Sequence, residues 1–103
     1  MNDKLSLHDN IVGILKTIYD PEIPVNLMDL GLIYAININD KKVTIQMTLT
    51  NPGCPVAEDF VKVVNSEIAA LPQVNEVVIE LVWDPPWTTD RMTEAAKLQL
   101  GLL

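Results

Sequence analysis

The sequence predicts an α/β (α+β) fold: one small domain with an αββαβ core, a mixed three-stranded sheet and a C-terminal helix. Apolar residues recur at helical spacing near the N-terminus and again in the middle of the chain. Other runs alternate between apolar and polar residues, which is typical of strands. A chain of 103 residues has the size of one ordinary domain, so we expect residues 1–103 to form a single domain.

The N-terminal apolar stripe predicts the first helix. Ser6, with Asp9 three residues later, is a typical capping pattern for a helix start. The helix is expected to end near Tyr19 or Asp20, because Pro21 disfavours helical geometry in the residue before it. The stripe consists of Leu7, Ile11, Ile14, Leu15 and Ile18.

Residues 20–31 are predicted to form a structured loop, because apolar residues that favour burial are mixed with two prolines and three acids. Asp20 and Glu22 flank Pro21, whose ring fixes the backbone, so their carboxylates are expected to keep a defined relation. The alternative is that Asp20 only closes a turn, as Asp often does. Taken alone, this stretch favours the turn.

Two alternating runs, residues 32–39 and 43–50, predict a hairpin with turn residues at 39–41. One face of each strand is expected to be apolar and the other more polar. The expected apolar sets are Leu32, Tyr34, Ile36 and Ile38 in the first strand, and Val43, Ile45, Met47 and Leu49 in the second; the polar set of the second is Thr44, Gln46, Thr48 and Thr50.

A second helix is predicted from Val56 to Leu71, with an apolar stripe on one side. A third strand is predicted over residues 77–83, and the crossover should return it beside the hairpin. Thr88 or Thr89 is expected to cap a last helix that runs to about Leu100. Trp83 and Trp87 lie on either side of a Pro-Pro pair, either as a cover for the core edge or as anchors for a partner.

Composition and charge exclude several classes of protein. The net charge is −7, which argues against a surface that binds nucleic-acid phosphates. No apolar run is long enough for a membrane span, and no secretory signal is evident at the N-terminus. The one cysteine forms no internal disulfide, which fits a reducing compartment, and we expect the protein to work in the cytoplasm.

Cys54 is the first candidate for chemistry. It precedes Pro55, a residue suited to the first position of a helix, so the thiol is expected at or next to the N-cap. The free N–H groups and the positive end of the helix dipole favour an anion there and lower a thiol pKa. Glu58 and Asp59 oppose this by repelling a thiolate. Free cysteine is also often buried, so a structural role stays open.

Other chemistry is missing from the sequence. It has no Gly-rich phosphate loop, no second cysteine and a single histidine, His8, so a Cys-His enzyme requires a fold that brings His8 to Cys54. If the second strand brings Thr50 to Asp20 and Glu22, a small polar site forms around Cys54. One thiolate per chain holds a labile metal or cluster only with help from a second copy, a partner or a small thiol.

Four motifs follow one another along the chain: Asp20-Pro21-Glu22, Leu30-Gly31-Leu32-Ile33-Tyr34, Thr50-x-x-x-Cys54-Pro55 and Trp83-Asp84-Pro85-Pro86-Trp87. In this order and at these spacings they resemble the SufT-like metal–sulfur cluster biosynthetic family. The family also includes domains that precede some P-loop cluster-carrier ATPases, and it is related to the eukaryotic cytosolic iron–sulfur targeting component and to PaaD. The resemblance covers nearly the whole chain.

The resemblance implies a role in the maturation of iron–sulfur proteins and not metabolite turnover, so no enzyme is expected. It implies Cys54 as the functional thiol and transient metal ligand, Asp20, Glu22 and Thr50 as its pocket, and Trp87 and Arg91 as a C-terminal motif for packing or for a partner. No tightly bound cofactor is implied, only transient contact with a cluster or iron. The implied partners are iron–sulfur scaffolds or carriers and apo-clients. The chain lacks the extra C-terminal cysteines of PaaD and a fused ATPase.

Three functional hypotheses follow. The first is an assembly or delivery factor that presents Cys54 to a cluster, to iron or to a partner thiol. The second is an adaptor that docks scaffold and client proteins, with a structural Cys54 and the tryptophan-flanked tail as its contact surface. The third is a thiol enzyme, which is disfavoured because the sequence offers no evident general base. The oligomeric state stays open; a homodimer would let two Cys54 thiols share a cluster.

Overall fold

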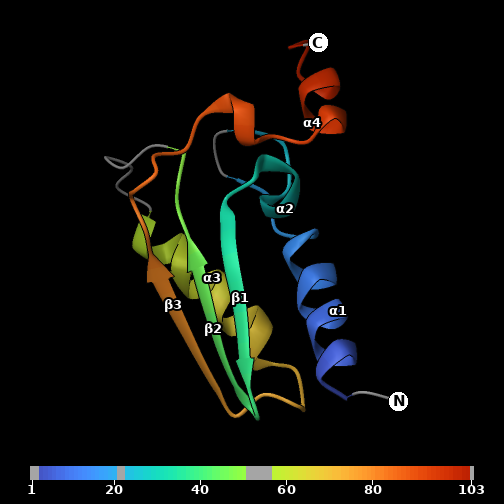
Figure 1. Ribbon diagram of the computed structural model, residues 1–103, viewed down its shortest axis with the longest axis vertical. Coiled ribbons are helices and arrows are strands. Elements are labelled where there is room, and N and C mark those ends of the chain that lie inside the picture. Colours follow the sequence, from blue (N-terminus) through green and yellow to red (C-terminus); the bar gives the residue numbers. More distant parts are fainter. Residues whose placement is uncertain (1–2, 21–22, 51–56, 103) are drawn as a thin grey trace.

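The computed structural model describes residues 3–20, 23–50 and 57–102 (Figure 1). The order of its elements is the one the sequence predicts, with one additional short helix and one 3-10 turn. The elements are α1 (Asp3–Leu15), α2 (Leu27–Leu30), β1 (Ile33–Asn39), β2 (Lys42–Met47), α3 (Ala57–Ala69), β3 (Glu76–Leu81), the 3-10 turn η1 (Thr89–Arg91) and α4 (Glu94–Gln99).

The three strands form a mixed sheet in the order β1-β2-β3, which confirms the predicted fold class. β1 and β2 are an antiparallel hairpin in which Ile36 lies opposite Ile45. β3 is parallel to β2, with Ile79 beside Ile45, and α3 makes the crossover between them. α3 packs against β3 and lies behind the sheet in Figure 1, while α1 contacts both β1 and α3. One face of the sheet is therefore covered by helices.

The core lies between this face and the two helices, and it confirms the predicted first helical stripe. Leu7, Ile11, Leu15 and Ile18 are buried, and Ile14 packs against them. The strands contribute Val43, Ile45 and Met47, and α3 contributes Val64 and Ile68.

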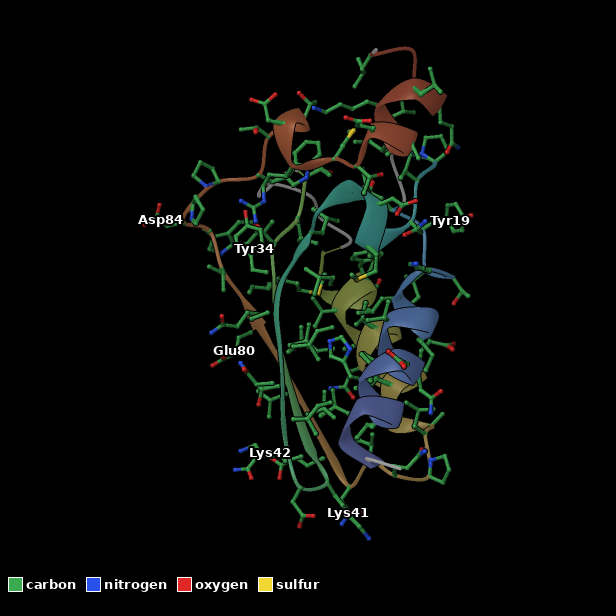
Figure 2. The ribbon with its side chains drawn as sticks, turned by 45° about the vertical axis from the view of Figure 1, so that its right-hand side comes forward. Tyr19, Tyr34, Lys41, Lys42, Glu80 and Asp84 are labelled. Carbon is green, nitrogen blue, oxygen red and sulfur yellow. The ribbon has the colours of Figure 1, made fainter. Side chains whose placement is uncertain are left out.

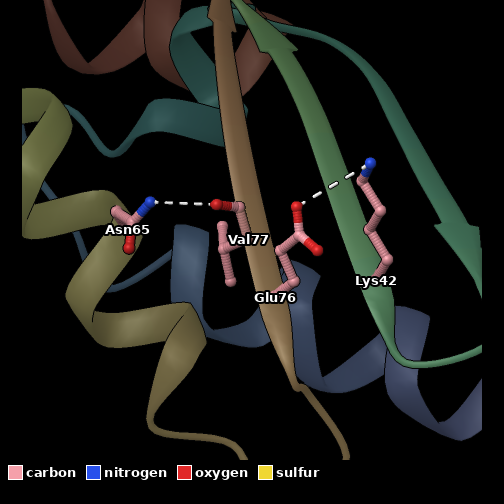
Figure 3. A network of polar contacts seen from close by, with 4 residues as sticks. All are labelled: Lys42, Asn65, Glu76 and Val77. Carbon is pink, nitrogen blue, oxygen red and sulfur yellow. Dashed lines mark hydrogen bonds and ion pairs between the residues drawn. The ribbon is translucent and has the colours of Figure 1, made fainter.

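The other face of the sheet carries polar cross-strand pairs. Lys42 Nζ lies 3.8 Å from Glu76 Oε2 across β2 and β3 (Figure 3), and both side chains are more than half exposed. Exposed pairs of this kind contribute little to stability.

The outer edge of the sheet is contacted by α3. The Asn65 side chain of α3 donates a hydrogen bond to the Val77 carbonyl at 3.3 Å, so one backbone acceptor of the outer strand β3 has a partner (Figure 3).

The ends of α1 differ from the prediction. The helix begins at Asp3, so Ser6 lies inside it and the predicted cap at Ser6 is wrong. It ends at Leu15 and not near Tyr19, because Thr17 N–H bonds the Ile14 carbonyl and tightens the last turn. The chain then runs extended, so that Tyr19 pairs with Asn26 in an antiparallel bridge.

The prediction for Tyr34 is also wrong. The β1–β2 register shifts between Ile33 and Ala35, so that Ile33, opposite Met47, and Ile36, opposite Ile45, share the core face. The extra residue is Tyr34, whose hydroxyl instead donates to the Pro85 carbonyl at 2.7 Å. A contact 51 residues away thus overrides the local alternation.

The last helix begins later than predicted. Thr88 precedes the 3-10 turn and makes no side-chain cap bond. The cap of α4 is Thr93, whose side chain accepts from the Ala96 N–H at 3.2 Å. The chain is extended at Met92, which is buried, so the interruption lets this side chain enter the core.

Gly31 and Gly13 make a matched pair for a stability test. Gly31 has a φ of +76°, and a Cβ there would overlap the Arg91 carbonyl oxygen, whereas a Cβ at Gly13 meets nothing within 4 Å. We expect Gly31→Ala to lower the free energy of unfolding by about 1–3 kcal/mol. Gly13→Ala should raise it by roughly 1 kcal/mol, since Gly is a poor helix former. Urea denaturation measures both; equal effects would contradict the close passage at Gly31.

Candidate functional site

Asp20 is the best described residue of the predicted pocket. It follows the Tyr19–Asn26 bridge, and its N–H donates to the Val25 carbonyl at 3.2 Å. Its Oδ1 accepts the Ile23 N–H at 3.0 Å, and the side chain is only 7% exposed. The carboxylate therefore does close a turn, as one of the two interpretations predicted, and the turn holds it at a fixed position.

Thr50 contacts Asp20 just beyond the end of β2, where the chain leaves the sheet. Thr50 Oγ1 lies 3.4 Å from Asp20 Oδ2, a long hydrogen bond between residues 30 positions apart. Before it, Thr48 N–H donates to the Leu32 carbonyl at 2.9 Å and Leu49 is buried, so the chain after β2 is held against the start of β1. The structure thus brings together two of the three predicted pocket residues. Glu22, the third, and the predicted functional thiol Cys54 lie outside the described residues.

Thr48 differs from its predicted place on the polar face. It is 1% exposed, and within the described chain its hydroxyl is buried without a hydrogen-bond partner. A hydroxyl removed from water without a partner is destabilising. The alternating pattern of β2 gives no indication of this burial, because the pattern reports only the hairpin and not what covers its end.

The predicted C-terminal motif, with Trp87 and Arg91, packs over the junction between α2 and β1. Trp87 Nε1 donates to the Leu30 carbonyl at 2.7 Å, and Arg91 Nε lies 3.4 Å from the Gly31 carbonyl. The Arg91 guanidinium also lies 4.0 Å from the centre of the Tyr34 ring, a cation–π distance. Trp87 is half-buried and packs on the core, while Arg91 is exposed. Both residues thus have a packing role; their role toward a partner stays a prediction.

The same segment is tied to the loop that carries Asp20. Thr93 N–H donates to the Asp29 carbonyl at 2.9 Å, and Gln99 Nε2 donates to the Pro24 carbonyl at 3.2 Å. The sequence gives no indication of these two contacts.

Within residues 3–20, 23–50 and 57–102, no group of three or more His, Cys, Asp or Glu side chains is placed to hold a metal ion. His8 is exposed and lies 4.0 Å from Asp9. The first half of α1, where His8 lies, is at the same end of the molecule as the start of β2 and away from the end of β2 (Figure 1). Of the helices described, none is long and apolar enough to cross a membrane.

The fold matches a solved structure of a small α+β domain. The crystal structure of a "Domain of Unknown Function DUF59" from Bacillus anthracis is 34% identical, with a TM-score of 0.87 over 95% of this chain and 94% of that one. Residues 8–80 match the model of a family described as "Iron-sulfur cluster assembly protein".

Two curated relatives cover almost the whole chain. An "Fe-S protein maturation auxiliary factor" of Porphyromonas gingivalis is 45% identical over 99% of this chain and 98% of its own. The "Fe-S protein maturation auxiliary factor YitW" of Bacillus subtilis is 42% identical over 94% and 96%. The chain belongs to the iron–sulfur cluster assembly protein family, as the four motifs predicted.

Asp20 offers a test that separates its charge from its acceptor oxygen. Asp20→Ala should lower the free energy of unfolding by about 1–3 kcal/mol, because the Ile23 N–H loses its acceptor. Asp20→Asn keeps an oxygen for this N–H and should retain most of the stability. Thermal or urea unfolding measures the difference, with the exposed Asp9→Ala as control. Equal stability of the Ala and Asn variants would contradict the turn-closing role.

Thr48 and Thr50 offer a second matched pair. Thr48→Val removes a buried hydroxyl that has no partner among the described residues, so stability should stay equal or rise by up to about 1 kcal/mol. Thr50→Val removes a donor to Asp20 and should lower stability by about 0.5–1.5 kcal/mol. Urea denaturation compares the two. A loss at position 48 as large as that at position 50 would show that the Thr48 hydroxyl has a partner.

Proposed function

We propose that this protein is an accessory factor of iron–sulfur cluster assembly or delivery, in which Cys54 engages a cluster, iron or a partner thiol. The observation that carries this proposal is the meeting of Thr50 and Asp20 at the end of β2. The membership of the chain in the iron–sulfur cluster assembly family supports it, as do the relatives that are named maturation auxiliary factors.

The covalent chain relates Cys54 to this meeting point. Thr50 comes four residues before Cys54, and Ala57, where α3 begins, comes three residues after it. An extended chain spans at most about 3.3–3.6 Å per residue. The covalent chain therefore allows at most about 11 Å between Cys54 and Ala57, and at most about 14 Å between Cys54 and Thr50. In parallel βαβ units, ligands bind beyond the carboxyl ends of the strands, which is where this segment leaves β2.

Asp20 suits a role beside a thiol or an iron ion. It is buried, and its two oxygens are oriented by the Ile23 N–H and the Thr50 hydroxyl, so it needs little rearrangement when cargo arrives. A carboxylate is an oxygen ligand that binds iron directly. Glu22, two residues further along the chain, is proposed as the second carboxylate of the pocket.

Each chain has one cysteine and therefore supplies at most one thiolate ligand to a cluster. Iron–sulfur clusters are held mostly by several thiolates, so the remaining ligands have to come from a scaffold, a carrier, an apo-client or a second copy of the chain. We therefore propose that cluster or iron is a transient cargo and that the protein, acting in the cytoplasm, has no tightly bound cofactor.

The proposal gives Cys54 no turnover chemistry. A thiol enzyme needs a general base, and the single histidine lies in the first half of α1, at the end of the molecule where β2 starts (Figure 1). The relatives named auxiliary factors support a non-catalytic role as well.

The first test is the rate of Cys54 alkylation against pH in native and unfolded protein. The proposal requires that Cys54 reacts in the native state, with an apparent pKa below the ~8.5 of a free thiol, because it precedes a helix start. Unfolding in urea gives the reference rate for the same thiol. A thiol that reacts only after unfolding would favour the adaptor hypothesis, in which Cys54 is structural.

The second test follows cluster delivery directly. Cys54→Ser should reduce transfer of a [4Fe–4S] cluster from a loaded scaffold to an apo-protein to the rate without the factor. The exposed Ser66→Ala variant serves as control and should transfer normally. Full transfer by the Cys54→Ser variant would reject the thiol mechanism in favour of an adaptor.

A further inference from the structure

An open groove of about 390 Å³ lies between the segment that leaves α1 and the exposed side of α3. Tyr19, which Figure 2 shows pointing away from the body of the molecule, forms part of one wall. The groove lies on the helix side of the molecule and not on the polar face of the sheet. Its lining residues are Thr17, Ile18, Tyr19, Phe60, Val63 and Glu67.

Both walls of the groove are held in place by the fold. On one side, the Ile18 carbonyl accepts the Leu27 N–H at 3.0 Å, and Tyr19 pairs with Asn26. On the other side, Val64 and Ile68 are fully buried, which fixes the rotation of α3. The groove is therefore already formed in the free protein and needs no rearrangement before binding.

The walls expose apolar surface that the fold does not use. Tyr19 is 56% exposed and Val63 is 48% exposed, although their chain neighbours Ile18 and Val64 are buried. Exposed apolar side chains scattered singly need no explanation, but two that line one groove mark an interaction surface. An aromatic ring with a polar hydroxyl is a frequent anchor in protein interfaces.

The charged residue that lines the groove is acidic. Glu67 lines it directly, and Asp59 lies four residues before Val63, so helical spacing puts Asp59 on the same side of α3. Lys62 is exposed, but it precedes Val63 directly and is turned about 100° around the helix. The net charge of −7 adds a long-range attraction for basic segments.

We propose that this groove docks a segment of a partner protein that inserts an apolar side chain and places a Lys or Arg beside Glu67. The inference rests on the proposed function, because the groove and the site are built on neighbouring residues: Tyr19 precedes Asp20, and Phe60 lies in the first turn of α3. A segment bound here is held beside the chain that leads to Asp20 and beside the first turn of α3. The groove thus selects the protein that exchanges cargo with the thiol.

The test uses the full-length protein, labelled with ¹⁵N, and two synthetic helical peptides that share the same leucine positions. One peptide carries Lys at its polar positions and the other carries Glu. The Lys peptide should shift the amide signals of Tyr19, Val63 and Glu67 and bind about tenfold more tightly than the Glu peptide. Shifts scattered over the whole surface would overturn the proposal.

Charge reversal in the protein provides a matched control. Glu67→Lys should weaken the Lys peptide about fivefold and strengthen the Glu peptide, because the partner of the cation changes sign. Glu80→Lys makes the same change in net charge on the opposite side of the molecule (Figure 2) and should change affinity less than about twofold. Equal effects of the two variants would reduce the binding to general attraction by an acidic protein and overturn the groove.

Removal of apolar surface tests the second half of the proposal. Val63→Ser should weaken the Lys peptide about fivefold, whereas Leu98→Ser, at a side chain 68% exposed on α4, should not. Concentration-dependent shifts of Tyr19 and Val63 without peptide, with a dimer in sedimentation, would assign the groove to a second copy of the chain and overturn the proposal.

The experiments on the groove and on the thiol can be interpreted independently of each other. Cys54→Ser should leave peptide affinity unchanged, and Val63→Ser should leave the alkylation rate of Cys54 unchanged. If peptide binding fails while Cys54→Ser still abolishes cluster transfer, the groove is rejected and the proposed function stands. If peptide binding holds while Cys54→Ser transfers normally, the groove is retained as the docking surface of an adaptor.

Discussion

The close passage of the C-terminal segment over Gly31 is the contact on which the rest of the structure depends. Because Gly31 has no Cβ, the Arg91 backbone lies directly against it, and Trp87 reaches the Leu30 carbonyl beside it. These contacts fix the turn between α2 and β1. The first residue of α2, Leu27, in turn donates a hydrogen bond to the Ile18 carbonyl. The contact between the C-terminal segment and Gly31 therefore also holds the chain after α1 and the loop with Asp20. A change at Gly31 is therefore expected to act on the site as well as on stability.

The site then follows from where the strands end. β2 and β3 are parallel, so a crossover has to leave the carboxyl end of β2 and return through α3. That end is the point where Thr50 meets Asp20 and from which the Cys54 segment departs. The hairpin and the crossover bring the two described residues of the proposed pocket together, and the buried turn at Asp20 orients one oxygen of its carboxylate. Asp20 and Thr50 are thus structural residues of the fold as well as residues of the proposed site.

Much of this was predictable from the sequence, and the failures have a common cause. The α1 stripe, the hairpin, α3 and β3 follow from local periodicity, because apolar residues that recur along each of them face the core, although Leu81 at the end of β3 is 38% exposed. The outward turn of Tyr34 and the burial of Thr48 depend on contacts between distant segments, which periodicity does not record. The capping residue Thr93 is likewise bonded through its N–H to the distant Asp29 carbonyl. The meeting of Asp20 and Thr50 was anticipated only on the condition that strand and loop reach the same edge.

If the proposed groove binds the partner and the proposed thiol site binds the cargo, the two together explain how the protein could select its partners. A single thiolate with one or two carboxylates recognises iron but offers little to tell one protein partner from another, because such ligands occur in every scaffold and client. Discrimination needs surface, and the groove between Tyr19 and Glu67 supplies apolar area and a charge within one rigid frame. Since the walls of the groove are set by α3 and by the bridge that precedes Asp20, the proposed docking surface and the proposed thiol site share the same two elements. Under this proposal a partner bound in the groove reaches the cargo site without a hinge motion, so that binding of the partner also raises its effective concentration at the thiol.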